Sequence, residues 1–423
     1  MHKIRSLLSS VNNKGFFHLL TSNFVVQFLG FAVIIYLPAV LSPEEVGAVR
    51  LLQTYGMLFI LLGTFGYNVA LLKTSSEDCS LDEKEIIFSY SSRRTIFFSL
   101  ISYGLLLVVN EFYFSSVNEF IYEWAPIYGV IIPFGAIVYG LTAYLQALKK
   151  IKEVAIAQVI MRSILIVLII IASYFWGFEG FVYSTIFSYV FGLAPFMKFI
   201  DFKIFFRSKT PNDRSRIDHY AYFTVLGVVI TTLGQYADLY LLDYLAISKA
   251  DLGVYAFATL FYQAGLIAIN TIQSIVTPYI SEKQNDLAWV WKKTVYYQLL
   301  SFGLSIILAL GMYLTSYLLV EYYLGDDYRL LPYFTLGIIA KFMVWSSYSV
   351  LGASLVGLGK IKIGFYFSLI TTPLSLLAGY ALFDIWGVYG VIAGQVISTL
   401  FLMIGIWVYF WIITHRRGET DYN

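Results

Sequence analysis

Long apolar stretches alternate with short polar ones along nearly the whole chain. Windows of about 20 residues, broken at charged or turn-rich segments, predict twelve helices long enough to cross a bilayer. These helices are expected near residues 17–41, 51–73, 95–114, 122–147, 154–176, 180–199, 219–246, 252–277, 294–317, 330–356, 363–382 and 387–412. Hydrocarbon offers no hydrogen-bond partner, so each spanning backbone must be helical. The pattern therefore predicts an all-α integral membrane protein.

Composition excludes an ordinary water-soluble protein. Hydrophobic residues make up 59% of the chain and charged residues 13%, with a mean hydropathy of +0.74, whereas soluble domains contain about 25% charged residues. The first apolar span is too long for a signal peptide and is expected to be retained as a helix. Cys79 is the single cysteine, so no internal disulfide is expected.

Several motifs recur at equivalent places in the two halves of the predicted topology. The pairs are WGFEG at 176–180 and WGVYG at 386–390, LKKIK at 148–152 and LGKIK at 358–362, and SPEEVGAV at 42–49 and SKADLGVY at 248–255. We interpret the chain as two copies of a six-helix unit. In the Trp-Gly-x-x-Gly copies, the glycines are expected to permit a tight turn and close helix packing.

This duplication predicts the domain organisation. An even number of helices returns the chain to its starting side, so the two copies are parallel repeats related by an axis along the membrane normal. We expect an N-lobe at residues 1–200, a cytoplasmic linker at 201–218 and a C-lobe at 219–423, with a central cavity between the lobes. Such an architecture is typical of a transporter that opens alternately to either side.

Lys and Arg residues gather in alternate connections between the predicted helices. With the amino terminus in the cytoplasm, all but five of the 28 fall in cytoplasmic segments, as the positive-inside rule expects. The exceptions are Arg50, Lys249 and Arg329 in outer segments, and Arg162 and Lys341 within helices. The charge pattern therefore predicts that both termini are cytoplasmic.

Arg162 and Lys341 are candidate substrate-binding residues. A basic side chain at the centre of a spanning helix costs about 2.5–3.5 kcal/mol, so such residues usually face a hydrated cavity. Two interpretations remain: the cations hold an anionic group of the substrate, or each pairs with a carboxylate such as Asp238. Asp238 is itself a candidate ion-coupling site, for Na⁺ or H⁺, or a structural counter-ion.

Uncharged polar residues form stripes on two predicted helices. Gln263 and Asn270 lie on one face of the eighth helix, and Asn23 and Gln27 are spaced i, i+4 on the first. These amides can bind a hydroxyl-rich ligand, or they can form hydrogen bonds between helices. We expect no metal site, no phosphate-binding loop, no nucleic-acid partner and no cofactor beyond a coupling ion.

Three stretches resemble a known family of transporters. Residues 41–73 (LSPEEVGAVRLLQTYGMLFILLGTFGYNVALLK), 235–263 (QYADLYLLDYLAISKADLGVYAFATLFYQ) and 386–398 (WGVYGVIAGQVIS) are similar to the multidrug/oligosaccharidyl-lipid/polysaccharide (MOP) superfamily, and most closely to its Wzx-type polysaccharide flippases. The resemblance covers essentially the whole chain and implies a MATE-like arrangement of two six-helix lobes.

The resemblance also implies a substrate and a location. The expected partner is an undecaprenyl-pyrophosphate-linked oligosaccharide, such as an O-antigen repeat unit, moved from the cytoplasmic to the outer leaflet of a bacterial cytoplasmic membrane. The partners would include membrane lipid and a polysaccharide polymerase. In the relatives, arginines on early helices handle the pyrophosphate. Here the residues offered there are Asn23 and Gln27 on the first helix, and Arg50 and Lys73 at the ends of the second.

Two other classes of protein remain as alternatives. A cation-coupled drug exporter of the same superfamily would need a carboxylate-rich cavity, whereas the intramembrane charges here are net basic. A membrane-embedded polymerase or ligase of the same pathway would need a large catalytic loop on the outer face, and the predicted outer connections are short. We therefore expect a transporter and no enzyme.

Overall fold

The computed structural model describes residues 33, 35–77, 80–207, 209–245, 247–360 and 362–415, and these contain helices and no β-strand. The all-α prediction is confirmed for them. The chain divides into two compact units, Met1–Val229 and Ile230–Asn423, which we call the N-unit and the C-unit. This division falls within a helix, and the predicted boundaries at 201 and 218 stay a prediction.

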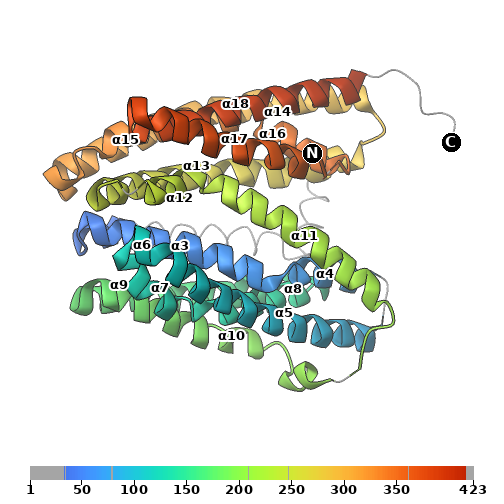
Figure 1. The fold of residues 1–423 in the computed structure, drawn as a ribbon. Helices are drawn as coiled ribbons and strands as arrows, with labels where there is room; N and C mark the ends of the chain where they lie inside the picture. The colour runs from blue at the N-terminus through green and yellow to red at the C-terminus, as the bar shows by residue number, and fades with distance from the viewer. Residues whose placement is uncertain are drawn as a thin grey trace. The chain divides into compact units, whose positions relative to one another are not determined.

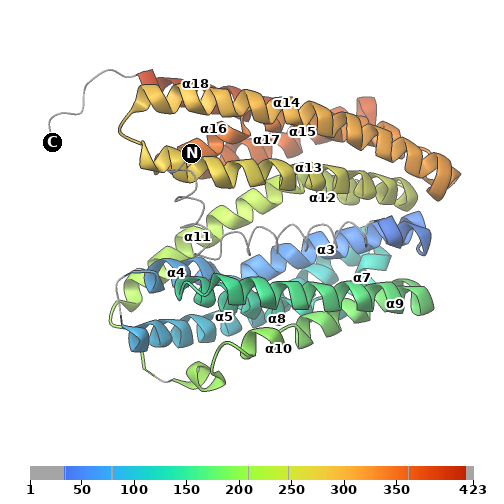
Figure 2. The ribbon, with the colours of Figure 1, turned by 180° about the vertical axis from the view of Figure 1, so that it is seen from behind.

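The N-unit contains the helices up to Val229, which lies within α11 (Figures 1 and 2). In chain order they are η1 (Leu37–Ala39), α3 (Pro43–Thr64), α4 (Tyr67–Ser75), α5 (Leu81–Val109), the π-helical turn η2 (Asn110–Phe114), α6 (Ser115–Val117), α7 (Glu119–Tyr128), α8 (Ile131–Ala147), α9 (Ile151–Phe191), α10 (Ala194–Met197), η3 (Phe202–Phe206) and α11 (Arg214–Gln235).

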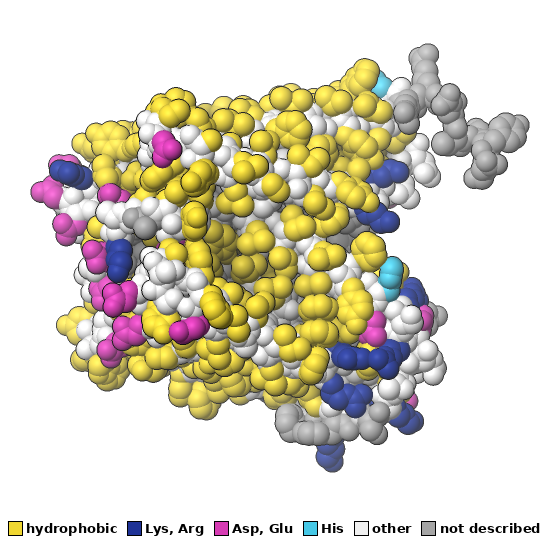
Figure 3. Space-filling model, in the orientation of Figure 1, with side chains coloured by type: hydrophobic (Ala, Val, Ile, Leu, Met, Phe, Trp, Pro, Cys, Tyr) yellow, Lys and Arg dark blue, Asp and Glu magenta, His cyan; other side chains and the backbone are white. Residues whose placement is uncertain are grey.

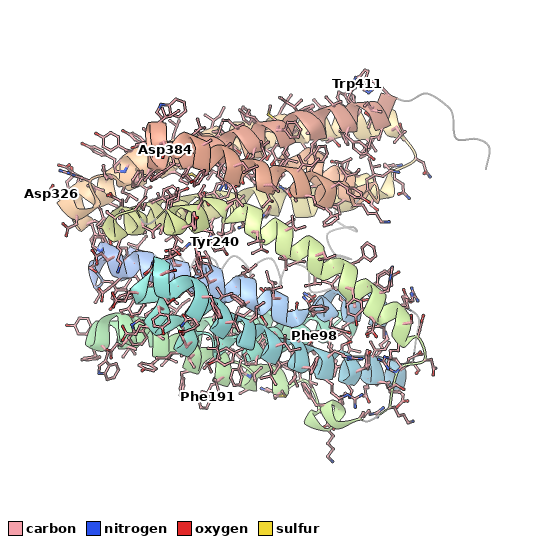
Figure 4. All side chains as sticks on the ribbon, in the orientation of Figure 1. Phe98, Phe191, Tyr240, Asp326, Asp384 and Trp411 are labelled. Atoms are coloured by element: carbon pink, nitrogen blue, oxygen red, sulfur yellow. The ribbon has the colours of Figure 1, made fainter. Side chains whose placement is uncertain are left out.

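The C-unit begins with the end of α11, residues 230–235, and continues to the end of the described chain. Its further helices are α12 (Ala237–Tyr244), α13 (Lys249–Glu282), α14 (Leu287–Leu319), the π-helical turn η4 (Val320–Leu324), η5 (Asp326–Tyr328), α15 (Leu331–Ser346), α16 (Ser349–Gly357), α17 (Lys362–Trp386) and α18 (Val388–His415). The labelled residues Asp326 and Trp411 lie at opposite ends of this unit (Figure 4).

Helices occupy the predicted spans wherever the structure describes them. In that part of the chain nine helices are long and apolar enough to cross a membrane, or ten if α7 and α8, bent by 50° at their junction, form one span. The first predicted span, 17–41, lies almost wholly outside the described residues, so the number twelve stays a prediction.

Several helices begin earlier than hydropathy indicates. α5 starts at Leu81 rather than near 95, because Ser80 accepts a hydrogen bond from the Glu83 N–H and caps the helix. Its charged first turns, with Asp82 and Glu83, complement the positive end of the helix dipole. A hydropathy window detects the apolar part of a helix and misses such polar extensions.

The two Trp-Gly-x-x-Gly motifs form equivalent turns. Gly177 and Gly387 have φ of 55° and 56°, a conformation that favours glycine. A straight helix as long as α9, with 41 residues, would extend about 62 Å, twice the thickness of a bilayer core. The non-helical backbone at Gly177 divides α9 into two helices, as the predicted spans 154–176 and 180–199 require.

The second glycine of each motif lets the chain fold back on itself. A Cβ at Gly180 would collide with the carbonyl group of Ala172, and a Cβ at Gly390 with that of Leu382. Each glycine therefore lies directly on the backbone of the preceding helix. The predicted roles of these glycines, a tight turn and close packing, are confirmed.

The other repeated motifs also have matching local structure. Lys149 and Gly359 both have positive φ, 59° and 74°, and the next N–H donates back to the carbonyl of Leu145 or Leu355, at 2.9 Å in each copy. Such a helix end leaves the last carbonyls satisfied. Together with the paired turns above, this equivalence supports two copies of one ancestral unit.

The motif pair at 42–49 and 248–255 starts a largely buried spanning helix in each unit. Ser42 caps α3 by accepting from the Glu45 N–H, and Ser248 caps α13 by accepting from the Asp251 N–H. In α3 and α13, 72% and 61% of the most apolar window is buried, whereas in α18 the share is 17%. These two helices are therefore the most buried of the long spanning helices described in their units.

The surface outside these helices is largely apolar. Phe112 is 82% exposed and Trp176 66% exposed, and Phe191, labelled in Figure 4, projects away from α9. Hydrophobic side chains cover most of the face drawn in Figure 3, while Lys and Arg gather at one end of the N-unit and Asp and Glu at the other. Exposed apolar area of this extent is stable only against lipid, so the protein is a multi-pass membrane protein.

Candidate functional site

A buried ion pair joins two helices of the C-unit. Lys341 on α15 donates from Nζ to Asp238 Oδ2 on α12 at 2.9 Å, and the two residues are 5% and 2% exposed. A buried charge is tolerated only when it is paired and hydrogen-bonded. Of the two interpretations of Lys341, pairing with Asp238 is the arrangement that the structure contains.

A break between two helices positions this pair. α11 ends at Gln235 and α12 begins at Ala237, so that Asp238 lies in the first turn of α12. The positive end of the α12 dipole stabilises the carboxylate, and the carbonyl at the negative end of α11, that of Gln235, lies 3.5 Å from Lys341 Nζ. The two half-helix ends thus receive charges of the appropriate sign.

Further groups satisfy the carboxylate and the ammonium. Tyr255 on α13 donates its hydroxyl to Asp238 Oδ2 at 2.7 Å, and the Leu239 N–H donates to Oδ1 at 3.0 Å. The ring of Tyr262 lies 5.1 Å from Lys341 Nζ, a cation–π distance. These contacts make the pair a fully bonded and electrically neutral unit.

A cavity of about 330 Å³ lies beside the pair, within the C-unit. Lys341 is the one charged residue among the described residues that line it, and no carboxylate does so. Hydroxyl groups of α17 and α18 form one wall: Ser368, Thr371, Thr372, Ser375, Ser398 and Thr399.

Amide and aromatic side chains complete the cavity wall. Asn270 on α13 and Gln395 on α18 contribute amides, and Tyr262, Trp345 and Tyr348 contribute rings. The wall therefore combines uncharged hydrogen-bonding groups with flat apolar faces, a composition that suits an uncharged polar ligand better than an ion.

The amides predicted on α13 are only partly brought together. Asn270 lines the cavity, whereas Gln263 does not line it and donates from Nε2 to the hydroxyl of Tyr236 at 3.3 Å. Asn23 and Gln27 on the first predicted helix lie outside the described residues. A role in ligand binding stays a prediction for all four.

Two predicted cations lie in the N-unit and are not among the residues that line the C-unit cavity. Arg162 is exposed on α9, and Arg50 is buried on α3. Both lie close enough to the hydroxyl of Tyr128 for their charges to act on it. Arg50 and Arg162 therefore both belong to the N-unit, whereas Lys341 belongs to the C-unit.

The expected location of Arg50 is wrong. Sequence analysis places it in an outer connection, before a helix that starts at residue 51, but it lies in α3, which begins at Pro43. The Ser42–Glu45 capping box starts this helix within the polar motif, where hydropathy indicates a loop.

The remaining predicted cation, Lys73, lies on the surface. Its side chain is 58% exposed and its Nζ lies 3.9 Å from Glu77 Oε1. Exposed pairs of this kind contribute little to stability. The position of Lys73 agrees with its prediction at the end of a helix, and a role in binding stays a prediction.

Sequence reasoning did not single out the hydroxyl wall of the cavity. Its signal is the spacing: residues 371, 372 and 375 on α17, and 395, 398 and 399 on α18, recur at intervals of three or four and so share a helix face. Each group is weak alone, because Ser and Thr are common inside spanning helices. Only the packing of α17 against α18 shows that the two faces meet.

A second polar cluster, which the sequence analysis did not predict, joins the start of α11 to α4 and α5 through hydrogen bonds. Asp218 accepts from the hydroxyls of Tyr67, at 2.7 Å, and Tyr90, at 2.8 Å. Arg214 and Arg94 donate from Nε to the Tyr90 hydroxyl at 2.9 and 3.2 Å. No group of three or more metal-ligating side chains occurs in the described part of the chain.

The fold is similar to that of solved MATE transporters. A multidrug resistance MATE family transporter of the MOP superfamily matches in an inward-facing conformation (TM-score 0.71, 15% identity, 95% of this chain and 96% of that one) and in an outward-facing one (0.70, 15%, 94% and 94%). A MOP superfamily transporter from Pyrococcus furiosus also matches (0.65, 14%, 94% and 95%). The protein therefore has the MATE-type membrane fold.

The sequence itself identifies the family. Residues 13–284 match the profile of the polysaccharide biosynthesis protein family, which covers more than half of the chain. The chain belongs to this family. No curated protein of known function matches it significantly.

Proposed function

We propose that the protein is a flippase for lipid-linked oligosaccharides. Its substrate would be an undecaprenyl-pyrophosphate-linked repeat unit, such as that of O-antigen, carried from the cytoplasmic to the outer leaflet of the bacterial cytoplasmic membrane. Membership of the polysaccharide biosynthesis family on a MATE-type fold is the observation that carries this proposal. The same fold adopts inward-facing and outward-facing conformations in another transporter, which supports alternating access.

Arg162 and Arg50 are the candidates for the pyrophosphate in this proposal. Both lie on apolar helices, where a cation is costly unless it has a function or a partner. A guanidinium group binds phosphate oxygens through two parallel N–H donors, so each of these residues has the chemistry to contact a pyrophosphate. Lys341 is a weaker candidate than its sequence position indicated, because Asp238 neutralises it.

Coupling to an ion gradient belongs to the same proposal. Asp238 is the candidate coupling residue, for H⁺ or Na⁺, since protonation of its carboxylate would remove the partner of Lys341. Undecaprenyl-linked substrate, membrane lipid and a polysaccharide polymerase are the proposed partners.

Complementation tests the function. In cells whose own transporter for the repeat unit is deleted, the wild-type chain should restore surface polysaccharide, and Arg162→Ala should lower it at least tenfold at equal protein level. Arg162→Lys should be partly active, because it keeps the charge but loses the bidentate geometry. The exposed Lys283→Ala serves as control and should leave the polymer unchanged. Full polymer with Arg162→Ala would exclude that residue from the mechanism.

A drug exporter is the second candidate, because MATE transporters for drugs share this fold. Expression of the chain in drug-sensitive cells separates the two functions. Increased resistance to cationic drugs, without restored polysaccharide in the deleted strain, would replace the flippase proposal. Restored polysaccharide with unchanged resistance would support it.

A further inference from the structure

The cavity of the C-unit is lined by neither of the two arginines proposed to bind pyrophosphate. It lies within Ile230–Asn423, whereas Arg50 and Arg162 lie in Met1–Val229. Its charge, its hydrogen-bonding groups and its size each restrict the ligand that it can hold.

Charge excludes an ion as the preferred ligand. The described residues that line the cavity include one cation, Lys341, and its charge is balanced at 2.9 Å by Asp238. A phosphate group would find no free positive charge, and a cationic drug would find no carboxylate in the wall. The site therefore favours a neutral ligand.

The wall hydroxyls present mainly hydrogen-bond acceptors. Thr371 donates to the carbonyl of Phe367 at 3.0 Å, and Ser398 and Thr399 donate to that of Gln395 at 2.9 and 2.7 Å. With their protons used in this way, the oxygens offer lone pairs to a ligand. A ligand rich in O–H donors is complementary to such a wall.

The amide and aromatic side chains of the wall provide further groups that are complementary to a sugar. The side-chain amides of Asn270 and Gln395 can both donate and accept. Tyr262, Trp345 and Tyr348 supply flat apolar surfaces, against which the C–H face of a pyranose ring can pack. Alternation of polar edges with apolar faces is the chemical character of a neutral sugar.

Size limits the ligand to a small part of the proposed substrate. A volume of about 330 Å³ is at the lower end of the roughly 300–1,000 Å³ found for small-molecule sites. It has room for a monosaccharide-sized group and not for a complete lipid-linked repeat unit.

We infer that the C-unit cavity binds one neutral sugar of the repeat unit, apart from the site that holds the pyrophosphate. This inference rests on the proposed function and adds to it a division of labour: the N-unit holds the charged group, and the C-unit recognises sugar. Gln395, Thr399 and Trp345 are the residues assigned to the sugar.

Binding to the purified full-length chain tests the inference directly. Calorimetric titration would use the oligosaccharide released by mild acid from the cell's lipid-linked repeat units and treated with phosphatase, so that it carries no phosphate ester. Wild-type protein should bind it, with no competition from inorganic pyrophosphate. Gln395→Ala should weaken binding tenfold or more. Thr399→Val should weaken it severalfold. Because valine is nearly isosteric with threonine, this second variant keeps the test valid if Gln395→Ala does not fold.

The matched control is Ser305→Ala. Ser305 is buried on α14 and donates to the Ser301 carbonyl, but it is not among the residues that line the cavity, so its replacement should leave binding unchanged. Equal binding by the Gln395 and Thr399 variants and wild type would overturn the inference. Displacement of the sugar by inorganic pyrophosphate would also overturn it. So would tighter binding of tetraphenylphosphonium, a lipophilic cation that represents a cationic drug.

The two proposals fail in different ways. If wild-type protein restores polysaccharide but binds no oligosaccharide, the sugar site is wrong and the flippase function stands. If wild-type protein restores no polysaccharide in the deleted strain, the flippase function is wrong, whatever the cavity binds.

Discussion

The Lys341–Asp238 pair illustrates how this protein accommodates charge at the scale of single residues. Moving each ion from water into a protein interior costs several kcal/mol. A contact of 2.9 Å, the Tyr255 hydroxyl and the ends of α11 and α12 offset that cost. The result is a polar junction between α12 and α15 without net charge.

Removal of one partner should therefore be costly. Lys341→Met leaves Asp238 buried without its cation, and we expect about 3–5 kcal/mol of destabilisation, measured as loss of folded protein in thermal unfolding followed by size-exclusion chromatography. Asp238→Asn should behave similarly. The exposed Lys73→Met is the control, with an expected effect within about 1 kcal/mol.

The double variant Lys341→Met with Asp238→Asn distinguishes an interaction from two independent effects. It should lose less stability than the sum of the two single losses, because no unpaired charge remains. Strict additivity would show that the two side chains do not depend on each other.

Glycine turns determine how neighbouring elements pack. In both Trp-Gly-x-x-Gly motifs the first glycine has positive φ and the second touches the backbone eight residues earlier. The turn and the helix contact are therefore specified by one short motif, and its repetition gives each unit the same final helix pair.

Alanine at the second glycine should disturb this helix pair. Gly180→Ala and Gly390→Ala each place a methyl group against a carbonyl, and we expect a loss of about 2 kcal/mol or more, as for overpacking of a core. Gly311→Ala is the control, since nothing lies within 4 Å of its added Cβ and alanine is the better helix former by up to about 1 kcal/mol. Unchanged folded yield and melting temperature for Gly180→Ala would contradict the close packing.

At the scale of the whole molecule, the polar segment near residues 201–218 is held by the N-unit. Arg207 forms ion pairs with Asp82 and, at 2.8 Å, with Glu85 on α5, and its carbonyl accepts from Ser89 at 2.7 Å. The hydrogen bond with Asp82 raises the pKa of Arg207 further. Arg216 binds Glu77 through two bonds of 2.6 and 3.0 Å, so the segment has defined contacts and is not a free tether.

Hydrogen exchange should detect these contacts. We expect backbone amides of residues 201–207 to exchange more slowly than those of an exposed loop, and Asp82→Asn combined with Glu85→Gln to accelerate them. High salt should have the same effect in the wild type, because exposed ion pairs are screened. Glu83→Gln on the same helix is the control; equal acceleration by it would show that the pairs with Arg207 are not responsible.

Hydropathy predicted the spanning helices well, because a helix in contact with lipid needs apolar residues regardless of which other helix it packs against. It failed at polar helix starts such as that of α5 at Leu81, where a capping serine extends the helix beyond the apolar window. It also missed the break at Tyr236, because that break lies inside one continuous apolar window. Arg50 was misplaced for the same reason as the start of α5.

The amino-acid sequence by itself determined the membrane class, the positions of the described helices and the duplication, since each depends on local composition or on motifs within a few residues. Only the tertiary structure decided that Lys341 pairs with Asp238 and that hydroxyls of α17 and α18 line one cavity. These contacts join residues far apart in the chain, and their formation depends on how helices pack rather than on any local preference.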